Sequence, residues 1–202
     1  MIPAFFHRNM NYSLPKSVKN GDKYIDVRYD FRVILEIIEM LSDSDLSNED
    51  KAEALIQMFY CDPTDITDYA EAVTECFKFI DQGKEEPKKG PKLVNWEQDF
   101  DMIIAPVNRV IGMECRAVDY DSDTNIGGIH WWTFLSAYME MGSDCLFSQV
   151  ISIRDKKARG ISLDKYEQKW YIRNRELVDM KHSYSEAEEE LIKQWTGGVT
   201  NG

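Results

Sequence analysis

The chain has 202 residues, of which 43% are hydrophobic and 12% aromatic, a composition typical of a globular protein and unlike that of a disordered one. Its formal net charge of −12 repels phosphate, which argues against affinity for nucleic acid or for an anionic membrane surface. No stretch reaches the apolar length of a membrane-spanning helix, and the first residues lack the long apolar run of a signal peptide. We therefore expect a cytoplasmic protein.

The N-terminal part predicts a β-hairpin followed by a helix. The segments SLPKSV and KYIDVR flank KNGD, in which Asn20 and Gly21 suit a tight turn that needs positive φ. Apolar residues then recur at helical spacing from Phe31 to Leu41. They form two stripes, so we expect this helix to be covered on two sides. The stripes are Phe31, Ile34, Leu35, Ile38 and Leu41, and Val33, Ile37 and Met40.

Two further helices are predicted before residue 83. Ser47 can cap a helix that runs through Phe59, and the Asp62-Pro63 pair ends it. The next helix carries an apolar stripe that we expect to face the core, and Gly83 ends it. The stripe consists of Ile66, Tyr69, Ala70, Val73, Phe77 and Ile80.

Residues 83–92, GKEEPKKGPK, read as a linker because they combine two prolines, two glycines and mixed charge. Beyond it, apolar residues from Trp96 to Ile111 share one helical face, and Gly112 ends the run. Pro106 falls inside this pattern and predicts either a kink or two shorter helices.

The pattern then dissolves into CRAVDYDSDTN and resumes in three helices, at about 129–141, 144–158 and 163–180. Ser162 is placed to cap the third of them, and Ser183 with Glu186 forms a capping box for a short last helix. In the third, the apolar stripe is Leu163, Tyr166, Trp170 and Leu177.

The predicted fold class is mainly α, a helical bundle with a small N-terminal β-hairpin and room for two lobes. The expected organisation is an N-terminal hairpin and helical lobe over 1–82, the linker 83–92, a C-terminal helical lobe over 93–194, and a flexible tail over 195–202.

One acidic stretch invites a calcium-binding interpretation, which its spacing does not support. In DYDSDTNIGGIH, acidic and amide side chains alternate as in an EF-hand loop, but Thr124 stands where glycine is needed and His130 where a bidentate glutamate is needed. We interpret the stretch as a solvated loop. The four cysteines form no Cys-x-x-Cys pair and lie in or beside apolar runs, so we expect small buried thiols.

The segment HWWTFLSAYM raises the question of whether His130 belongs to an active site. No second histidine, cysteine pair or serine is spaced to form a triad with it, and its place at a helix start suits a cap. The aromatic residues behind it lie on two faces of one helix, and we expect them in the core. These faces are Trp131, Phe134, Leu135 and Tyr138, and Trp132 with Met139. We predict no catalytic, cofactor or metal site.

Charge is distributed unevenly along the chain. Residues 43–75 contain ten acidic residues and one lysine, whereas residues 154–176 contain eight basic and four acidic residues. Two interpretations stay open: either the charges are solvated helix faces or attract each other between lobes of the molecule, or a basic turn, RDKKARGISLDK, meets an acidic partner surface. In the second, the partner-binding residues are Arg154, Lys156, Lys157, Arg159 and Lys165. Nucleic acid is a poorer choice of partner because the rest of the molecule is acidic.

Two stretches resemble a family of small siphophage proteins named after the fifteenth gene product of its type phage. In that family a His-Trp-Trp-x-Phe helix leads into one that ends in Ile-Arg-Asp-Lys-Lys-Ala-x-Gly, and a Leu-Asp-Lys-Tyr-Glu helix follows. This chain has GIHWWTFLSAYMEMG, IRDKKARG and LDKYE at these places. Its N-terminal segment SLPKSVKNGDKYIDVRYDFRVILEI is similar to the family as well.

The resemblance implies a role in tail assembly without enzymatic activity. Genes of this kind typically lie just before the tape-measure gene of long non-contractile tails, the position usually held by tail-assembly chaperones. The expected function is thus a host-cytoplasmic helper that binds the tape-measure protein; the alternative is a connector or completion protein that stays in the virion. Further candidate partners are the tail tube protein and a second copy of the chain.

Overall fold

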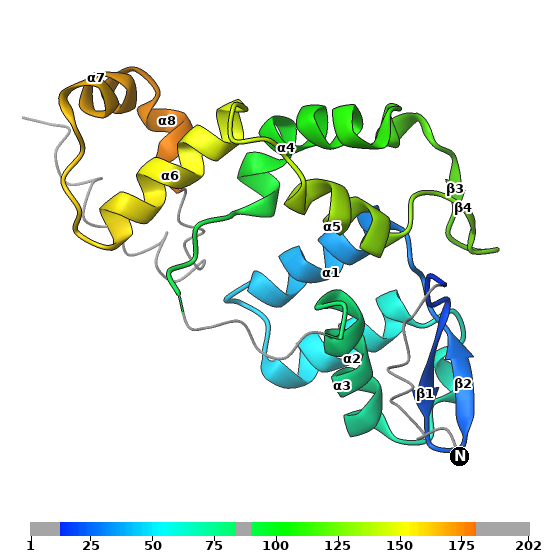
Figure 1. Ribbon diagram of the computed structural model, residues 1–202. Coiled ribbons are helices and arrows are strands. Elements are labelled where there is room, and N and C mark those ends of the chain that lie inside the picture. The colour runs from blue at the N-terminus through cyan, green and yellow to red at the C-terminus, as the bar shows by residue number, and fades with distance from the viewer. Residues whose placement is uncertain (1–12, 84–89, 181–202) are drawn as a thin grey trace, which may run out of the picture.

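The computed structural model describes residues 13–83 and 90–180, and within these ranges the molecule is mainly helical (Figure 1). The mainly α class with an N-terminal hairpin is therefore confirmed. The strands are β1 Ser17–Asn20, β2 Lys23–Asp26, β3 Tyr120–Asp121 and β4 Ile126–Gly127. The helices are α1 Phe31–Ser42, α2 Asn48–Phe59, α3 Tyr69–Ile80, α4 Trp96–Ile111, α5 Trp131–Met139, α6 Leu146–Ala158, α7 Lys165–Arg173 and α8 Arg175–Val178.

The N-terminal hairpin turns one residue later than predicted. Strands β1 and β2 pair antiparallel with Asn20 opposite Lys23, so Gly21 and Asp22 form the turn, and Gly21 has a φ of +61°. Asn20 ends β1 instead, with its side chain buried. Its amide oxygen accepts hydrogen bonds from the backbone N–H groups of Thr67 and Asp68, which ties the hairpin to the start of α3.

Helices α1 and α2 follow the sequence pattern. The side chain of Asp30 caps α1, and Ser47 caps α2 by accepting a hydrogen bond from the backbone of Asp50. Helix α1 buries Phe31, Ile34 and Ile37 completely, and its other apolar residues pack partly buried against the same core. The expected cover on two sides of α1 is therefore confirmed.

Helix α3 buries a different face from the one predicted. Its core residues are Ala72, Cys76 and Phe79, while Tyr69 is 63% and Phe77 43% exposed. The reason lies in tertiary contacts, because the hydroxyl of Tyr60 donates a hydrogen bond to the carbonyl of Ala72 and so fixes this side of α3 against the end of α2.

Helix α4 is continuous from Trp96 to Ile111 with Pro106 inside it, so two separate helices are not formed. Its C-cap is Gly112, in the left-handed conformation with φ +83°, as the sequence predicts. After it comes a second hairpin, β3–β4, which sequence periodicity missed because each strand has only two residues.

The carboxylate of Asp30 holds this second hairpin against the start of α1. It is fully buried and accepts hydrogen bonds from the backbone of Ile129 and from the side chain of Arg32. Gly128 lies so close that a Cβ there would stand 2.1 Å from Asp30 Oδ2. Glycine at 128 thus permits a contact that any other residue would block.

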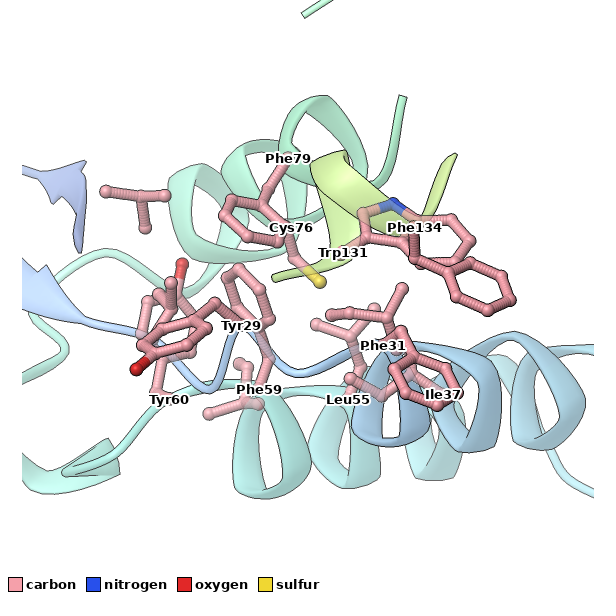
Figure 2. Packing of buried hydrophobic residues seen from close by; sticks show 14 of the residues in the cluster. Tyr29, Phe31, Ile37, Leu55, Phe59, Tyr60, Cys76, Phe79, Trp131 and Phe134 are labelled. Carbon is pink, nitrogen blue, oxygen red and sulfur yellow. The ribbon is translucent and has the colours of Figure 1, made fainter. Parts of the chain in front are cut away.

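One hydrophobic core contains residues from both sides of the predicted linker (Figure 2). The ring of Phe134 stacks on that of Phe31 at 4.5 Å between centroids, and Trp131 donates a hydrogen bond from its indole to the carbonyl of Ile80. The expectation that Trp131 and Phe134 belong to the core is confirmed, whereas Met139, predicted on a second buried face, is 61% exposed. A second, smaller cluster of Val150, Ile153 and Val178 lies between α6 and α8.

The C-terminal helices keep their order but differ in their ends. Asp164, and not Ser162, caps α7, in a capping box with Glu167. Asn174 separates α7 from α8 where one helix to residue 180 was predicted. The predicted capping box at Ser183, the tail 195–202 and most of the linker 83–92 lie outside the described residues.

Candidate partner-binding surface

Arg154 is part of the protein's interior, which corrects its prediction as a partner-binding residue. It is 5% exposed and forms a bidentate ion pair with Asp99 of α4, at 2.6 and 2.9 Å. Its other donors reach the carbonyls of Leu93, Leu177 and Val178. The side chain therefore joins α4, α6 and α8 and has no donor left for a partner.

Three further cations of the predicted basic turn form ion pairs within the chain. Lys156 pairs with Glu167 on α7, and Arg159 pairs with Asp155 one helical turn before it. Lys157 pairs with Asp179 at 2.6 Å, with its ammonium 4.0 Å from the ring centroid of Tyr171. The ion pairs of Lys156 and Lys157 fasten α6 to the elements that follow it, whereas that of Arg159 lies at the end of α6 itself.

The pKa of Asp179 reflects the hydrogen bonds that its carboxylate accepts from neighbouring side chains. Burial acts to raise the pKa of Asp179, but hydrogen bonds from Lys157, Arg175 and Tyr171 outweigh burial and lower that pKa to about 2. Asp179 is therefore ionised at neutral pH and balances its basic neighbours. One of the four excess positive charges in 154–176 is thus neutralised by a residue just beyond that range.

Lys165 differs from the other predicted residues because it lies on an exposed helix and forms no ion pair in the part of the chain described. Lys169 and Arg173 follow on the same helix and are likewise exposed and unpaired within the described ranges. At 100° per residue these three cations share one side of α7. Next to them stand Tyr166, 72% exposed, and Ile172, 65% exposed. We call these five residues the outer face of α7.

Sequence reasoning found only part of this surface. Lys165 was predicted, but Lys169 and Arg173 were counted in the charge excess without being singled out, and Tyr166 was placed in the apolar stripe. The signal was the spacing of Lys165, Lys169 and Arg173 at four-residue intervals. The structure shows that the other predicted cations form ion pairs within the chain. The unpaired positive charge of this region therefore lies on the outer face of α7.

The remaining candidates have structural roles in the described part of the chain. His130 caps α5: its Nδ1 accepts a hydrogen bond from the backbone N–H of Trp132, and its Nε2 lies 2.8 Å from the carbonyl oxygen of Pro15. Since a carbonyl only accepts, Nε2 carries the proton and the ring is neutral. Burial is the main cause that lowers the pKa of this ring.

The acidic loop 119–125 forms the tip of the second hairpin. Asp121 accepts hydrogen bonds from Asp123 and Thr124 within the loop, and the side chain of Asn125 donates to the carbonyl of Val27. Among the described residues, no group of three or more His, Cys, Asp or Glu side chains is arranged to hold a metal ion. Cys76 and Cys115 are buried, and Cys61 and Cys145 are partly buried.

Comparison with known proteins identifies the chain's relatives. The model of a family described as "Bacteriophage Gp15 protein" matches residues 10–110, half of the chain. The chain belongs to this family. No curated protein and no solved structure matches it. Membership in the Gp15 family indicates a phage structural or assembly protein.

The Gp15 match covers the N-terminal hairpin and helices α1 to α4. It therefore agrees with the N-terminal part of the resemblance seen in the sequence. The segments HWWTF, IRDKKARG and LDKYE lie beyond residue 110, as does the outer face of α7, so the match assigns them no role. In the described part of this Gp15 protein, no helix is both long and apolar enough to cross a membrane.

Proposed function

We propose that this Gp15-family protein is a non-enzymatic tail-assembly chaperone in the host cytoplasm. It binds the tape-measure protein and keeps that long helical chain soluble while tail tube subunits polymerise around it. The family supports the coarser role in phage structure or assembly. The finer role rests on the resemblance of the sequence to proteins encoded beside tape-measure genes.

The observation that carries the proposal is the outer face of α7. A helix whose exposed side combines large apolar side chains with unpaired cations can pack along another helix, burying Tyr166 and Ile172 while the cations pair with that helix's acidic residues. Tape-measure helices with exposed apolar stripes are partners of this kind. The acidic remainder of the molecule would keep the complex dispersed.

The test is co-expression with the tape-measure protein of the same phage. We expect the two to co-purify and the soluble fraction of the tape-measure protein to rise. The double variant Lys165→Glu, Lys169→Glu should lose both effects and stay folded, because both side chains are exposed. The variant Lys19→Glu, Lys92→Glu changes the net charge equally at exposed positions away from α7 and should retain both.

Finished particles separate the chaperone from the structural alternative. A chaperone leaves the assembly, so mass spectrometry of purified phage particles should not detect it. Its presence in particles at a fixed copy number would make it a tail component such as a connector. If wild-type protein neither binds the tape-measure protein nor enters particles, both roles are refuted.

A further inference from the structure

Helices α1 and α2 carry the carboxylates that match the outer face of α7. Glu36 and Glu39 on α1 and Glu49 and Glu53 on α2 are exposed, and within the described ranges no hydrogen bond or ion pair joins any of them to another group. The two helices pack against each other. We call these four residues the acidic face.

One pair of carboxylates in the acidic face matches one pair of cations on the outer face of α7 in spacing as well as in sign. Glu49 and Glu53 are four residues apart, and so are Lys169 and Arg173. Four residues of α-helix rise about 6 Å, close to one full turn, so each pair points to one side of its helix at the same separation. Two helices laid side by side can therefore form both ion pairs at once.

The apolar residues fit the same arrangement. Ile172 and Tyr166 extend from α7 beside its cations. Met40 stands one helical turn after Glu36 on α1, where it packs against the core and leaves only part of its side chain exposed beside the carboxylates. Covering exposed apolar side chains adds a favourable term that does not weaken with salt.

The two faces cannot meet within one molecule. Figure 1 shows α7 at the far end of α6, well separated from α1 and α2. Ion pairs and the buried Arg154 hold α6, α7 and α8 together and to α4, so α7 cannot swing across. This structure therefore gives no support to the attraction within the molecule that the charge pattern left open.

We infer that the outer face of α7 binds the acidic face of a second copy of this chain. Two copies of the acidic face repel each other, as do two copies of the α7 face, so the contact joins unlike surfaces. A contact of this kind closes into a dimer when the two copies bind each other reciprocally, and otherwise leaves one free face at each end and continues into a ring or a filament. The net charge of −12 opposes association at long range, but salt screens it beyond about 8 Å at physiological ionic strength.

The inference does not depend on the proposed function, and its test uses the full-length protein alone. Sedimentation velocity should show a weight-average mass that rises with protein concentration and falls when salt is added. Neutralising Lys169→Gln with Arg173→Gln, or Glu49→Gln with Glu53→Gln, should weaken association about fivefold, the loss expected from two exposed ion pairs. The controls Lys19→Gln with Lys92→Gln and Glu97→Gln with Glu140→Gln should associate like the wild type.

An equimolar mixture of the two neutralised variants gives the decisive result. Each variant keeps one intact face, so the mixture should form a one-to-one dimer with the wild-type affinity, about fivefold tighter than either variant associates with itself. Circular dichroism of each variant verifies the fold. A wild-type protein that remains monomeric at all concentrations, variants that associate as strongly as the wild type, or a mixture without dimer would each overturn the inference.

Discussion

Single buried groups fix the position of whole elements in this molecule. Asp30 is fully buried and accepts hydrogen bonds from Arg32 and Ile129. Arg154 links α4, α6 and α8. Removing one member of such a group leaves the other buried without a partner, and this costs more than the interaction contributes.

Replacing Arg154 tests this at the C-terminal end. Arg154→Ala removes five hydrogen bonds and leaves the carboxylate of Asp99 buried and unpaired, so we expect a loss of about 3–5 kcal/mol in the free energy of unfolding. Arg159→Ala, at an exposed ion pair, should cost less than about 1 kcal/mol. Urea denaturation measures both, and equal losses would contradict the structural role of Arg154.

Gly128 offers a second test at the same scale. Gly128→Ala places a Cβ 2.1 Å from Asp30 Oδ2 at a φ of +73°, so we expect a loss above about 2 kcal/mol. Gly160→Ala has a similar φ of +68° with open space around it and should cost only about 1 kcal/mol. Thermal unfolding of the two variants separates the steric conflict from the backbone strain that they share.

At the scale of elements, caps and periodicity were predictable where they depend on nearby residues. Ser47 marked the start of α2 and Gly112 the end of α4, because a cap acts within one helical turn. Which face of α3 is buried depended instead on contacts with other elements, so the apolar residues Tyr69 and Phe77 are exposed although their stripe predicted burial.

The prediction of the partner-binding residues was limited in the same way, because their burial depends on contacts that are distant in the sequence. Arg154 resembled its exposed neighbours in the sequence because its partner Asp99 lies 55 residues away. The nearest clue was the position of Arg154 on α6, where Val150 and Ile153 mark a buried face. Lys165, which was predicted to bind a partner, is exposed because the Asp164 cap places it in the first turn of an outer helix.

Helix α5 provides a pH-dependent prediction. Its cap, His130, has a lowered pKa in the folded protein, so the unfolded chain takes up a proton more readily. The stabilising contribution is therefore complete above the unfolded pKa of about 6.5 and is lost as the pH falls towards the lower folded value. Protonation of Nδ1 also removes the acceptor for the backbone N–H of Trp132.

We expect the free energy of unfolding to fall as the pH drops below about 6.5, and to fall less steeply in the variant His130→Asn. Asparagine can cap α5 without titrating in this range. Urea denaturation at several pH values gives the two slopes. Parallel slopes would show that His130 contributes nothing to the pH dependence.

At the scale of the whole molecule, the described residues before and after the predicted linker share one hydrophobic core. Phe31 from one side and Phe134 from the other stack directly, so neither half can complete its packing alone. The smaller cluster beside α6 and α8 is tied to this core through α4.

One core predicts one cooperative unfolding transition. Tryptophan fluorescence should report chiefly the C-terminal half, where all five tryptophans lie, while far-ultraviolet circular dichroism reports the helices of both halves. We expect the two signals to follow the same urea curve. Separate midpoints would show that the halves unfold independently.

The hydrogen bonds of Arg154 also determine when its surroundings can be completed while the chain is being synthesised. The guanidinium binds Asp99 in α4 together with the carbonyls of Leu177 and Val178, which leave the ribosome long after α4. At typical bacterial elongation rates the interval is roughly 4 to 16 s. During part of that time Arg154 is present without the carbonyls of Leu177 and Val178, so its set of acceptors is complete only when the last described helix has been made.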